Sequence, residues 1–588
     1  MSGFTAIISK KNTIPSPLTF RDKNVYGQES RFHTSYIDAE KYRIEHFTHN
    51  KFEHDKILKE DEQFVIGIEG VILNLSELAI ATQQTDIYNI IKKLFITKGN
   101  EFIHSLKGEF VGFIYSKTDN KWVIFANPTG TKRLFYFQNE NYLLFSSDVR
   151  ELTDLCHKLL IPITLDTNGA YLMLTYGYML EDTTLVSEIK RVAPGTMLAF
   201  EKGELTVASY FNLSCIEKTT DTKEQVIEKM DELFSKAVRL EFEKDKEYNY
   251  KHIATLSGGL DSRMTVLVAN ELGYKEQLNF TFSQSNYLDE MIPKKIASDY
   301  AHEFLFQSLD NGNYLKDIDK TIYYNDGLIL YSGSSHVLKS IENINFDKYG
   351  LIHTGLIGDA VIGSFLSQPF VVKPTIYSGA YSTKLITKIE PYLQAIVDKY
   401  PSEELFKFYG RGFLAATNGN FYFDIFTQAV TPFLDLDFLS YCYSIPDEWK
   451  YKHKIYLEWI AKKHPEFAKY QWEKTGVSPL KSNNYKKYFD WNYYQRMKLK
   501  FFDKLSKKMN SGMNPFDNWF AKNPDLQLTF SRYFEENIAL LSDKPDLKKD
   551  CEYLFAEGNT NERLQVLTLL GAIKLHFTQQ KTRSRSNG

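Results

Sequence analysis

A short glycine-containing segment, ATLSGGLDSRMTV at residues 254–266, has the clearest potential for chemistry. An apolar run enters this segment and an apolar pattern with helical spacing leaves it, which predicts a strand, a turn and the start of a helix. In α/β proteins such a turn holds phosphate, because the first backbone N–H groups of a helix are free to bind anions. We therefore predict that the turn binds a phosphate compound.

The turn differs from two common nucleotide-binding loops. It lacks the lysine of G-x-x-x-x-G-K-[ST] and it lacks the spacing G-x-G-x-x-G. Asp261 is present instead, and a negative side chain beside phosphates requires a cation such as Mg²⁺ between them. Backbone N–H groups and hydroxyls remain available for phosphate oxygens at Ser257, Gly258, Gly259 and Ser262.

Composition limits the class of protein. At 588 residues the chain is too long for one ordinary hydrophobic core, so we expect two or more domains. A formal net charge of -3 offers no basic surface for nucleic acid or an anionic membrane. No apolar run approaches the ~20 residues of a membrane span, and the N-terminus shows no secretory pattern. Four scattered cysteines predict neither disulfides nor a zinc site, so we expect a cytoplasmic protein.

The patterns of the elements divide the chain in two. Residues 1–150 consist of short apolar and aromatic runs separated by turn residues, which predicts antiparallel strands, and a last hairpin is expected at 192–211. An amphipathic helix is expected over 223–245, and we place the domain boundary just before it. From 252 onward strands alternate with helices, which predicts a parallel sheet wound by helices, and beyond about 375 the pattern is mostly helical.

The turn resembles the S-G-G-x-D-S loop of the N-type ATP pyrophosphatases, which cleave ATP to AMP and pyrophosphate. Within that superfamily, three later segments resemble segments of asparagine synthetases and their relatives, in the same order along the chain. They are LIHTGLIGDAVIGSF at 351–365, TPFLDLDFLSYCYSIP at 431–446 and WEKTGVSP at 472–479. Each later segment is weak by itself, whereas the ordered set is hard to produce by chance.

The resemblance implies the residues of a site. Asp261 and Asp359 would bind Mg²⁺, and Lys474 would stabilise pyrophosphate and the developing charge, so these three are expected to be catalytic. A larger set would contact ATP and pyrophosphate: Leu256, Ser257, Gly258, Gly259, Leu260, Ser262, Phe282, Thr354 and Gly355. Asp289 is either a further polar member of the site or a helix N-cap.

The resemblance also implies a reaction with ATP and Mg²⁺. A substrate carboxylate attacks the α-phosphorus, pyrophosphate leaves into the turn, and ammonia or another amine converts the acyl-adenylate into an amide and AMP. At the position of Leu356, asparagine synthetases have a glutamate and β-lactam synthetases a tyrosine, and leucine can transfer no proton. Candidates for another base are His353, Asp424 and Tyr422, and the change argues against free aspartate as the substrate.

The β-rich front part resembles the class II (Ntn-type) glutaminase domain of glutamine-dependent asparagine synthetases, but its chemical residues are missing. Ser2 stands at the position of the nucleophilic cysteine, and Glu69 replaces the oxyanion-hole asparagine that precedes Gly70. Val71 replaces the acidic residue that would bind the glutamine amine. We expect this domain to be a structural remnant. The segments that carry its resemblance are 69–78, 106–116, 130–137 and 143–152.

We therefore predict an α/β protein. An Ntn-like αββα sandwich domain at 1–215 is followed at 222–588 by a parallel-sheet ATP-pyrophosphatase (HUP-like) domain with a helical C-terminal part. The expected function is an asparagine synthetase-like ligase that amidates a small-molecule, glycan or peptide carboxylate, for example a uronic acid of a surface polysaccharide. Alternatives are an intramolecular cyclase of the β-lactam synthetase or lasso-peptide kind, a glutamine-hydrolysing asparagine synthase, and an inactive scaffold. The sequence predicts neither the substrate nor the oligomeric state.

Overall fold

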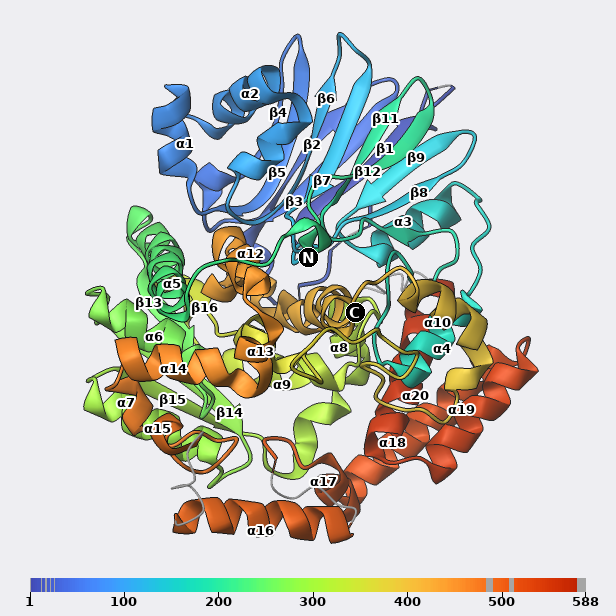
Figure 1. Cartoon of the computed structure of the whole chain (residues 1–588). Helices are drawn as coiled ribbons and strands as arrows, with labels where there is room; N and C mark the ends of the chain where they lie inside the picture. The colour runs from blue at the N-terminus through green and yellow to red at the C-terminus, as the bar shows by residue number, and fades with distance from the viewer. Residues whose placement is uncertain are drawn as a thin grey trace.

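The computed structural model describes residues 2–578 apart from positions 12, 16, 17, 22 and 26 and the segments 483–489 and 507–511. It consists of an N-terminal part with two six-stranded sheets, a central five-stranded sheet and a helical C-terminal part (Figure 1). This arrangement confirms the predicted α/β class. Within the described ranges, no helix is long and apolar enough to cross a membrane.

Two antiparallel sheets form the N-terminal sandwich. Their strands are β1 (Gly3–Ser9), β2 (Phe32–Asp38), β3 (Tyr42–His49), β4 (Ile57–Glu60), β5 (Phe64–Ile72), β6 (Gly108–Ser116), β7 (Lys121–Ala126), β8 (Phe135–Gln138), β9 (Tyr142–Ser146), β10 (Lys190–Arg191), β11 (Thr196–Glu201) and β12 (Glu204–Ser209). The orders are β10-β8-β9-β1-β3-β2 and β12-β11-β7-β6-β5-β4. Side chains that alternate along the strands, such as Phe4, Phe113 and Trp122, pack together between the two sheets.

Helices cover the outer faces of both sheets. α1 (Leu75–Thr82) and α2 (Ile87–Lys98) pack on the sheet that contains β5, whereas α3 (Val149–Lys158) packs on the sheet that contains β1. α4 (Thr167–Thr175) follows α3 and packs against α20 (Thr560–Phe577). These four layers are the predicted αββα sandwich (Figure 1). The hairpin expected near residue 200 is formed by β11 and β12.

The central sheet is parallel, with the order β15-β14-β13-β16-β17. α5, α6 and α7 share one apolar cluster with it and α8 and α9 share another, so helices cover both faces. The predicted alternation of strands and helices is therefore confirmed. The elements are α5 (Lys223–Glu247), β13 (Lys251–Thr255), α6 (Asp261–Glu271), β14 (Gln277–Ser283), α7 (Leu288–Asp299), β15 (Glu303–Ser308), α8 (Ile318–Asn325), α9 (Ser332–Ile341), β16 (Tyr349–His353) and β17 (Ala429–Val430).

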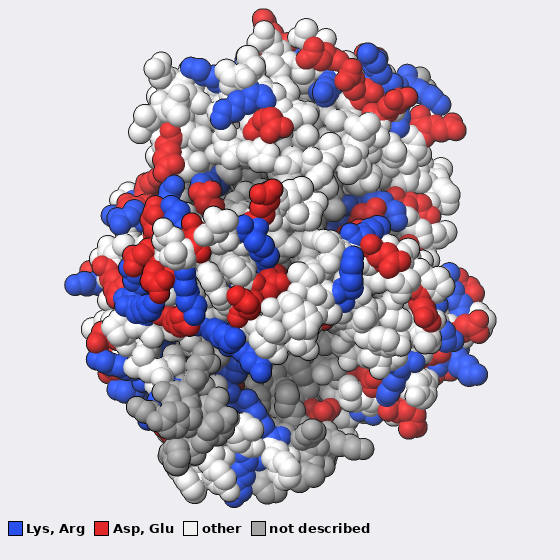
Figure 2. All heavy atoms as spheres, in the orientation of Figure 1, with Lys and Arg blue, Asp and Glu red and all other residues white. Residues whose placement is uncertain are grey.

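The C-terminal helices connect the two parts. Leu172 of α4, Ile322 of α8 and Leu567 of α20 belong to one buried apolar cluster, so the end of the chain packs against the N-terminal sandwich (Figure 1). Acidic and basic side chains are interspersed over the face shown in Figure 2. The helices after β16 are α10 (Glu390–Val397), α11 (Glu403–Lys407), α12 (Leu436–Ser444), α13 (Asp447–Lys450), α14 (Lys454–Lys463), α15 (Pro479–Ser482), α16 (Trp491–Ser506), α17 (Phe516–Lys522), α18 (Pro524–Asn537), α19 (Pro545–Glu557) and α20 (Thr560–Phe577).

Candidate active site

The predicted phosphate turn lies between β13 and α6, at the carboxyl edge of the parallel sheet. Open parallel sheets bind their ligands at this edge. The segment after β16 comes directly beside the turn, and a Cβ atom at Gly355 would lie 2.1 Å from the Ser262 backbone nitrogen. Phe433, from the third segment, packs against Gly358 of the second. Segments that are distant in the sequence thus form one site, and Gly355 permits the closest approach.

A cavity of about 300 Å³ opens at this edge of the sheet. Most of the predicted ATP contacts line it: Leu256, Ser257, Gly259, Ser262, Phe282, Thr354 and Gly355. The predicted metal ligand Asp261 lines it as well. Four other predicted residues, two of them within the turn, do not line the cavity. Leu260 is 3% exposed and packs into the core, and the Gly258 carbonyl accepts a hydrogen bond from the Glu473 N–H. Asp359 and Lys474 both act on the Asp261 carboxylate.

Asp261 and Asp359 come together at the turn. The Asp359 N–H donates to Asp261 Oδ2 at 2.9 Å, and the Tyr456 hydroxyl donates to Asp261 Oδ1 at 2.9 Å. Burial and the neighbouring Asp359 carboxylate raise the pKa of Asp261 to about 8. Two adjacent carboxylates attract a cation, and hard oxygen donors are the ligands that Mg²⁺ prefers. The residues present therefore fit the magnesium ion that the sequence predicts.

Lys474 is held by a residue that the sequence did not indicate. Its Nζ lies 2.7 Å from His453 Nε2, and its charge acts on Asp261. Burial and Lys474 lower the pKa of His453 to about 4, so the imidazole is neutral at physiological pH. Sequence reasoning missed His453 and Tyr456 because each is a single residue outside any motif, and only the tertiary packing of α14 and of the residue that precedes it brings them to the turn.

The backbone N–H groups of the turn already donate hydrogen bonds to side-chain oxygens of the protein. Ser257 N–H donates to Ser262 Oγ at 2.9 Å, and Gly259 N–H donates to Ser257 Oγ at 3.2 Å. Gly258 N–H donates to Asp289 Oδ1 at 2.7 Å. Asp289 does not cap α7, whose N-cap residue is Tyr287, but instead anchors the turn from the neighbouring helix. A phosphate that used these N–H groups would replace their present partners.

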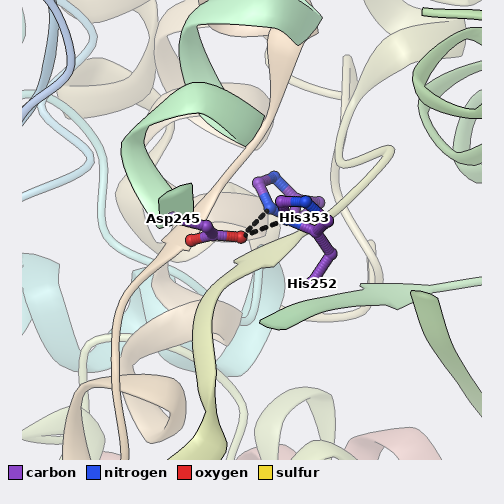
Figure 3. Close-up of side chains that lie close together, drawn as sticks. All are labelled: Asp245, His252 and His353. Carbon is purple, nitrogen blue, oxygen red and sulfur yellow. Dashed lines mark hydrogen bonds and ion pairs between the residues drawn. The ribbon is translucent and has the colours of Figure 1, made fainter. Parts of the chain in front are cut away.

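His353, a candidate for the missing base, belongs to a buried cluster on the α5 side of the sheet. Its Nε2 and the Nδ1 of His252 lie 2.8 and 2.9 Å from the same oxygen of Asp245 (Figure 3). Burial alone would lower the pKa of His353, but Asp245 and Glu241 raise it to about 9. The cluster has the residue types of a metal site, but its hydrogen bonds already satisfy the donor atoms that would bind the ion. It holds α5 to the sheet and does not line the cavity.

The other two candidate bases also lie away from the cavity wall. Asp424 forms an ion pair of 2.8 Å with Lys132, and the Tyr422 hydroxyl donates to the Thr321 carbonyl at 2.7 Å. Neither is among the described residues that line the large cavity, whereas Leu356 is. The structure thus assigns no proton-transfer role to His353, Asp424 or Tyr422.

The position that the sequence predicts to have lost its oxyanion-hole asparagine is filled by buried charge. Glu69 on β5 is fully buried, 2.8 Å from His46 Nε2 and 3.6 Å from Lys56 Nζ. Burial alone would raise the pKa of Glu69, but Lys56 and His46 hold it well below its usual range. The next residue, Gly70, has φ +132°, and a Cβ there would lie 2.0 Å from a backbone oxygen. Ser2 is 6% exposed, and its Oγ has no hydrogen-bond partner among the described residues.

Two small cavities, of about 30 and 40 Å³, lie between the N-terminal sandwich and the parallel-sheet part. Glu109 lines both, and the Lys132–Asp424 pair lines the first. Leu356 and Asn420 line the first small cavity and also the large one. Cavities of this size have room for only a few water molecules, so the space between the two parts is narrow and charged.

Comparisons with known proteins agree with this architecture. A sequence profile of the glutamine amidotransferase domain matches residues 42–211. Glutamine-hydrolysing asparagine synthetase 1 of Bacillus subtilis is 23% identical over 276 residues, 45% of this chain and 42% of that protein, so the match spans less than half of this relative. A relative from Methanocaldococcus jannaschii, named after the same activity, is 24% identical over 366 residues, 59% of this chain and 67% of that one.

Among solved structures, glutamine phosphoribosylpyrophosphate amidotransferase of Bacillus subtilis matches with a TM-score of 0.22 and 9% identity over 52% of this chain and 59% of that one, a likeness too slight to support a conclusion. The sequence matches show that the chain is similar to asparagine synthetases over part of its length. Its N-terminal domain is of the glutamine amidotransferase type.

Proposed function

We propose that this protein is an ATP-dependent ligase that adenylates a carboxylate and then forms an amide. The observation that carries the proposal is the apposition of Asp261 and Asp359 beside a glycine turn at the carboxyl edge of a parallel sheet. A magnesium ion bound by these carboxylates would neutralise charge on the triphosphate. The similarity to asparagine synthetases supports the same class of reaction.

In this proposal ATP occupies the large cavity. Adenine and ribose lie against Leu256 and Phe282, and the triphosphate reaches the turn. The hydroxyls of Ser257 and Ser262 bind the departing pyrophosphate, and Lys474 offsets its charge. These groups stabilise charge that develops as the bond between the α-phosphorus and the bridging oxygen breaks.

The part of the site that would face the carboxylate substrate differs from that of an enzyme that amidates free aspartate. Leu356 and Asn420 offer neither a base nor a charge to an amino-acid substrate. We propose ammonia or another amine as the nitrogen donor, and a carboxylate carried by a sugar, a peptide or another small molecule as the substrate. We propose 1–215 as a domain that makes no ammonia, because Glu69 stands where an oxyanion would form, and 222–588 as the domain that forms the amide.

The proposal is tested by incubating the protein with ATP, Mg²⁺, ammonium and a panel of carboxylates that includes glucuronate, an acidic peptide and aspartate. We expect AMP and pyrophosphate to form only when a suitable carboxylate is present, with aspartate a poor substrate. Omission of the carboxylate is the control. Absence of both ATP binding and turnover would favour an inactive scaffold instead.

A further inference from the structure

The turn that presents His453 has an unusual backbone. Lys452 and His453 have φ values of 58° and 61°, so two successive non-glycine residues are left-handed. Such conformations are costly, and they persist where the surrounding structure holds them, often at functional sites. Here the surrounding structure includes Gly363, from the second motif, with φ +113°. A Cβ at Gly363 would lie 2.7 Å from Cβ and the carbonyl oxygen of Lys450, so this glycine allows the turn to approach the Asp359 segment.

The contact with Lys474 fixes the tautomer of His453. A lysine ammonium can only donate hydrogen bonds, so Nε2 of the neutral imidazole must accept and Nδ1 must carry the hydrogen. Nδ1 is buried and has no hydrogen-bond partner among the described residues, although the residue as a whole is 5% exposed. A buried donor without an acceptor is costly in a native structure. The Nδ1–H group of His453 therefore needs a hydrogen-bond acceptor, and a bound ligand could supply one.

The position of His453 indicates which acceptor this is. Its Nε2 bonds to Lys474, and the charge of Asp359 acts on the imidazole. It thus lies with the carboxylate pair, at the end of the site where the proposed function places the polyphosphate. Phosphate oxygens accept hydrogen bonds from neutral donors as well as from cations. A neutral imidazole donor beside an ammonium would bind such oxygens without adding a second positive charge.

We propose that His453 is a pyrophosphate-binding residue, whose Nδ1–H donates to a phosphate oxygen while Lys474 keeps the ring in the donor tautomer. This inference rests on the proposed function of the site. It adds a residue from the turn before α14 to those that the motifs supply. It also explains why position 363 is a glycine, since a side chain there would push the turn away from Asp359.

The test compares the binding of three compounds by isothermal titration calorimetry in the presence of Mg²⁺: pyrophosphate, α,β-methylene-ATP and AMP. In His453→Ala the affinity for the first two should fall about ten- to a hundredfold, as for a lost hydrogen bond to a charged group. AMP binding should stay unchanged, which also shows that the variant is folded. His453→Gln, which keeps an acceptor and a donor, should recover most of the affinity. His104→Ala, at an exposed histidine, is the matched control.

Unchanged pyrophosphate binding in His453→Ala would overturn the inference, and so would an equal loss for all three compounds, which indicates a structural role. Failure of the proposed function has a different signature. In that case the unaltered protein would bind neither pyrophosphate nor the ATP analogue. If the unaltered protein and His453→Ala both bind pyrophosphate and the ATP analogue with the same affinity, the ligase proposal stands and the proposed role of His453 is wrong.

Discussion

At the scale of single residues, Asp261 is subject to two opposing influences. Burial and Asp359 favour its neutral form, whereas the hydrogen bonds from the Asp359 N–H and from Tyr456 favour its charged form. The balance leaves its pKa at about 8, so the carboxyl is mostly protonated at neutral pH when no cation is bound. A cation that uses this carboxylate must therefore displace a proton.

This gives the first prediction: Mg²⁺ binding to the nucleotide-free protein releases a proton, and the affinity rises with pH until about 8, the pKa of Asp261. Calorimetry near neutral pH in two buffers of different ionisation enthalpy measures the released proton. Asp261→Asn should bind Mg²⁺ more weakly and release none, while Asp398→Asn, at an exposed site, should behave as the unaltered protein does. Tight binding that is independent of pH and buffer would contradict the assignment.

Asp261 was predicted from the composition of its turn, and Asp359 and Lys474 from the resemblance of their segments to those of asparagine synthetases. His453 could not be predicted in this way. Its proposed role depends on a left-handed turn and on a contact with Lys474, and neither of these leaves a local sequence pattern.

At the scale of elements, α5 is joined to the parallel sheet by buried charge as well as by apolar packing. Asp245 of α5 accepts from the Leu351 N–H at 2.7 Å and pairs with His353 and His252. The sequence predicted α5, β13 and β16 from periodicity, since buried faces impose regular spacing. It could not predict this cluster, because the pairing of β13 with β16 brings together residues that are far apart in the chain.

The second prediction concerns stability. His353 has a pKa raised from 6.5 to about 9, so its pairing stabilises the fold fully below pH 6.5 and the contribution is lost as pH rises through about 9. His353→Asn should therefore lower the free energy of unfolding by about 3 kcal/mol in mildly acidic solution, and by less toward pH 9. Denaturant unfolding across this pH range measures the difference. The His353 ring also stacks on Phe242, with 3.7 Å between the ring centroids. An unchanged penalty at all pH values would show that this packing, not charge, is responsible.

At the scale of the whole molecule, buried ion pairs and the C-terminal helices join the amidotransferase-type part to the parallel-sheet part. Lys132–Asp424 at 2.8 Å, Arg150–Asp326 at 3.0 Å and Lys244–Asp55 at 3.3 Å all cross between them. The return of α20 to α4 could not be predicted from the sequence, because an apolar helix face shows that it is buried but not where.

The third prediction is that the N-terminal part makes no ammonia for the site. Glutamine should support no amide formation and release no glutamate, whereas ammonium should support turnover with a suitable carboxylate. Ser2→Cys should not produce glutaminase activity, because Glu69, paired with His46 and Lys56, would still stand at the proposed oxyanion position. Glutamate formation by either protein, measured by amino-acid analysis, would show that this domain is active.

The central claim is that the Asp261–Asp359 site cleaves ATP between its α- and β-phosphates. The most direct measurement is ³¹P NMR of the products formed from ATP, Mg²⁺, ammonium and an accepted carboxylate. We predict AMP and pyrophosphate from the unaltered protein and from Asp398→Asn, and loss of both products in Asp261→Asn. Formation of ADP and phosphate, or of AMP and pyrophosphate at an unchanged rate in Asp261→Asn, would contradict the account.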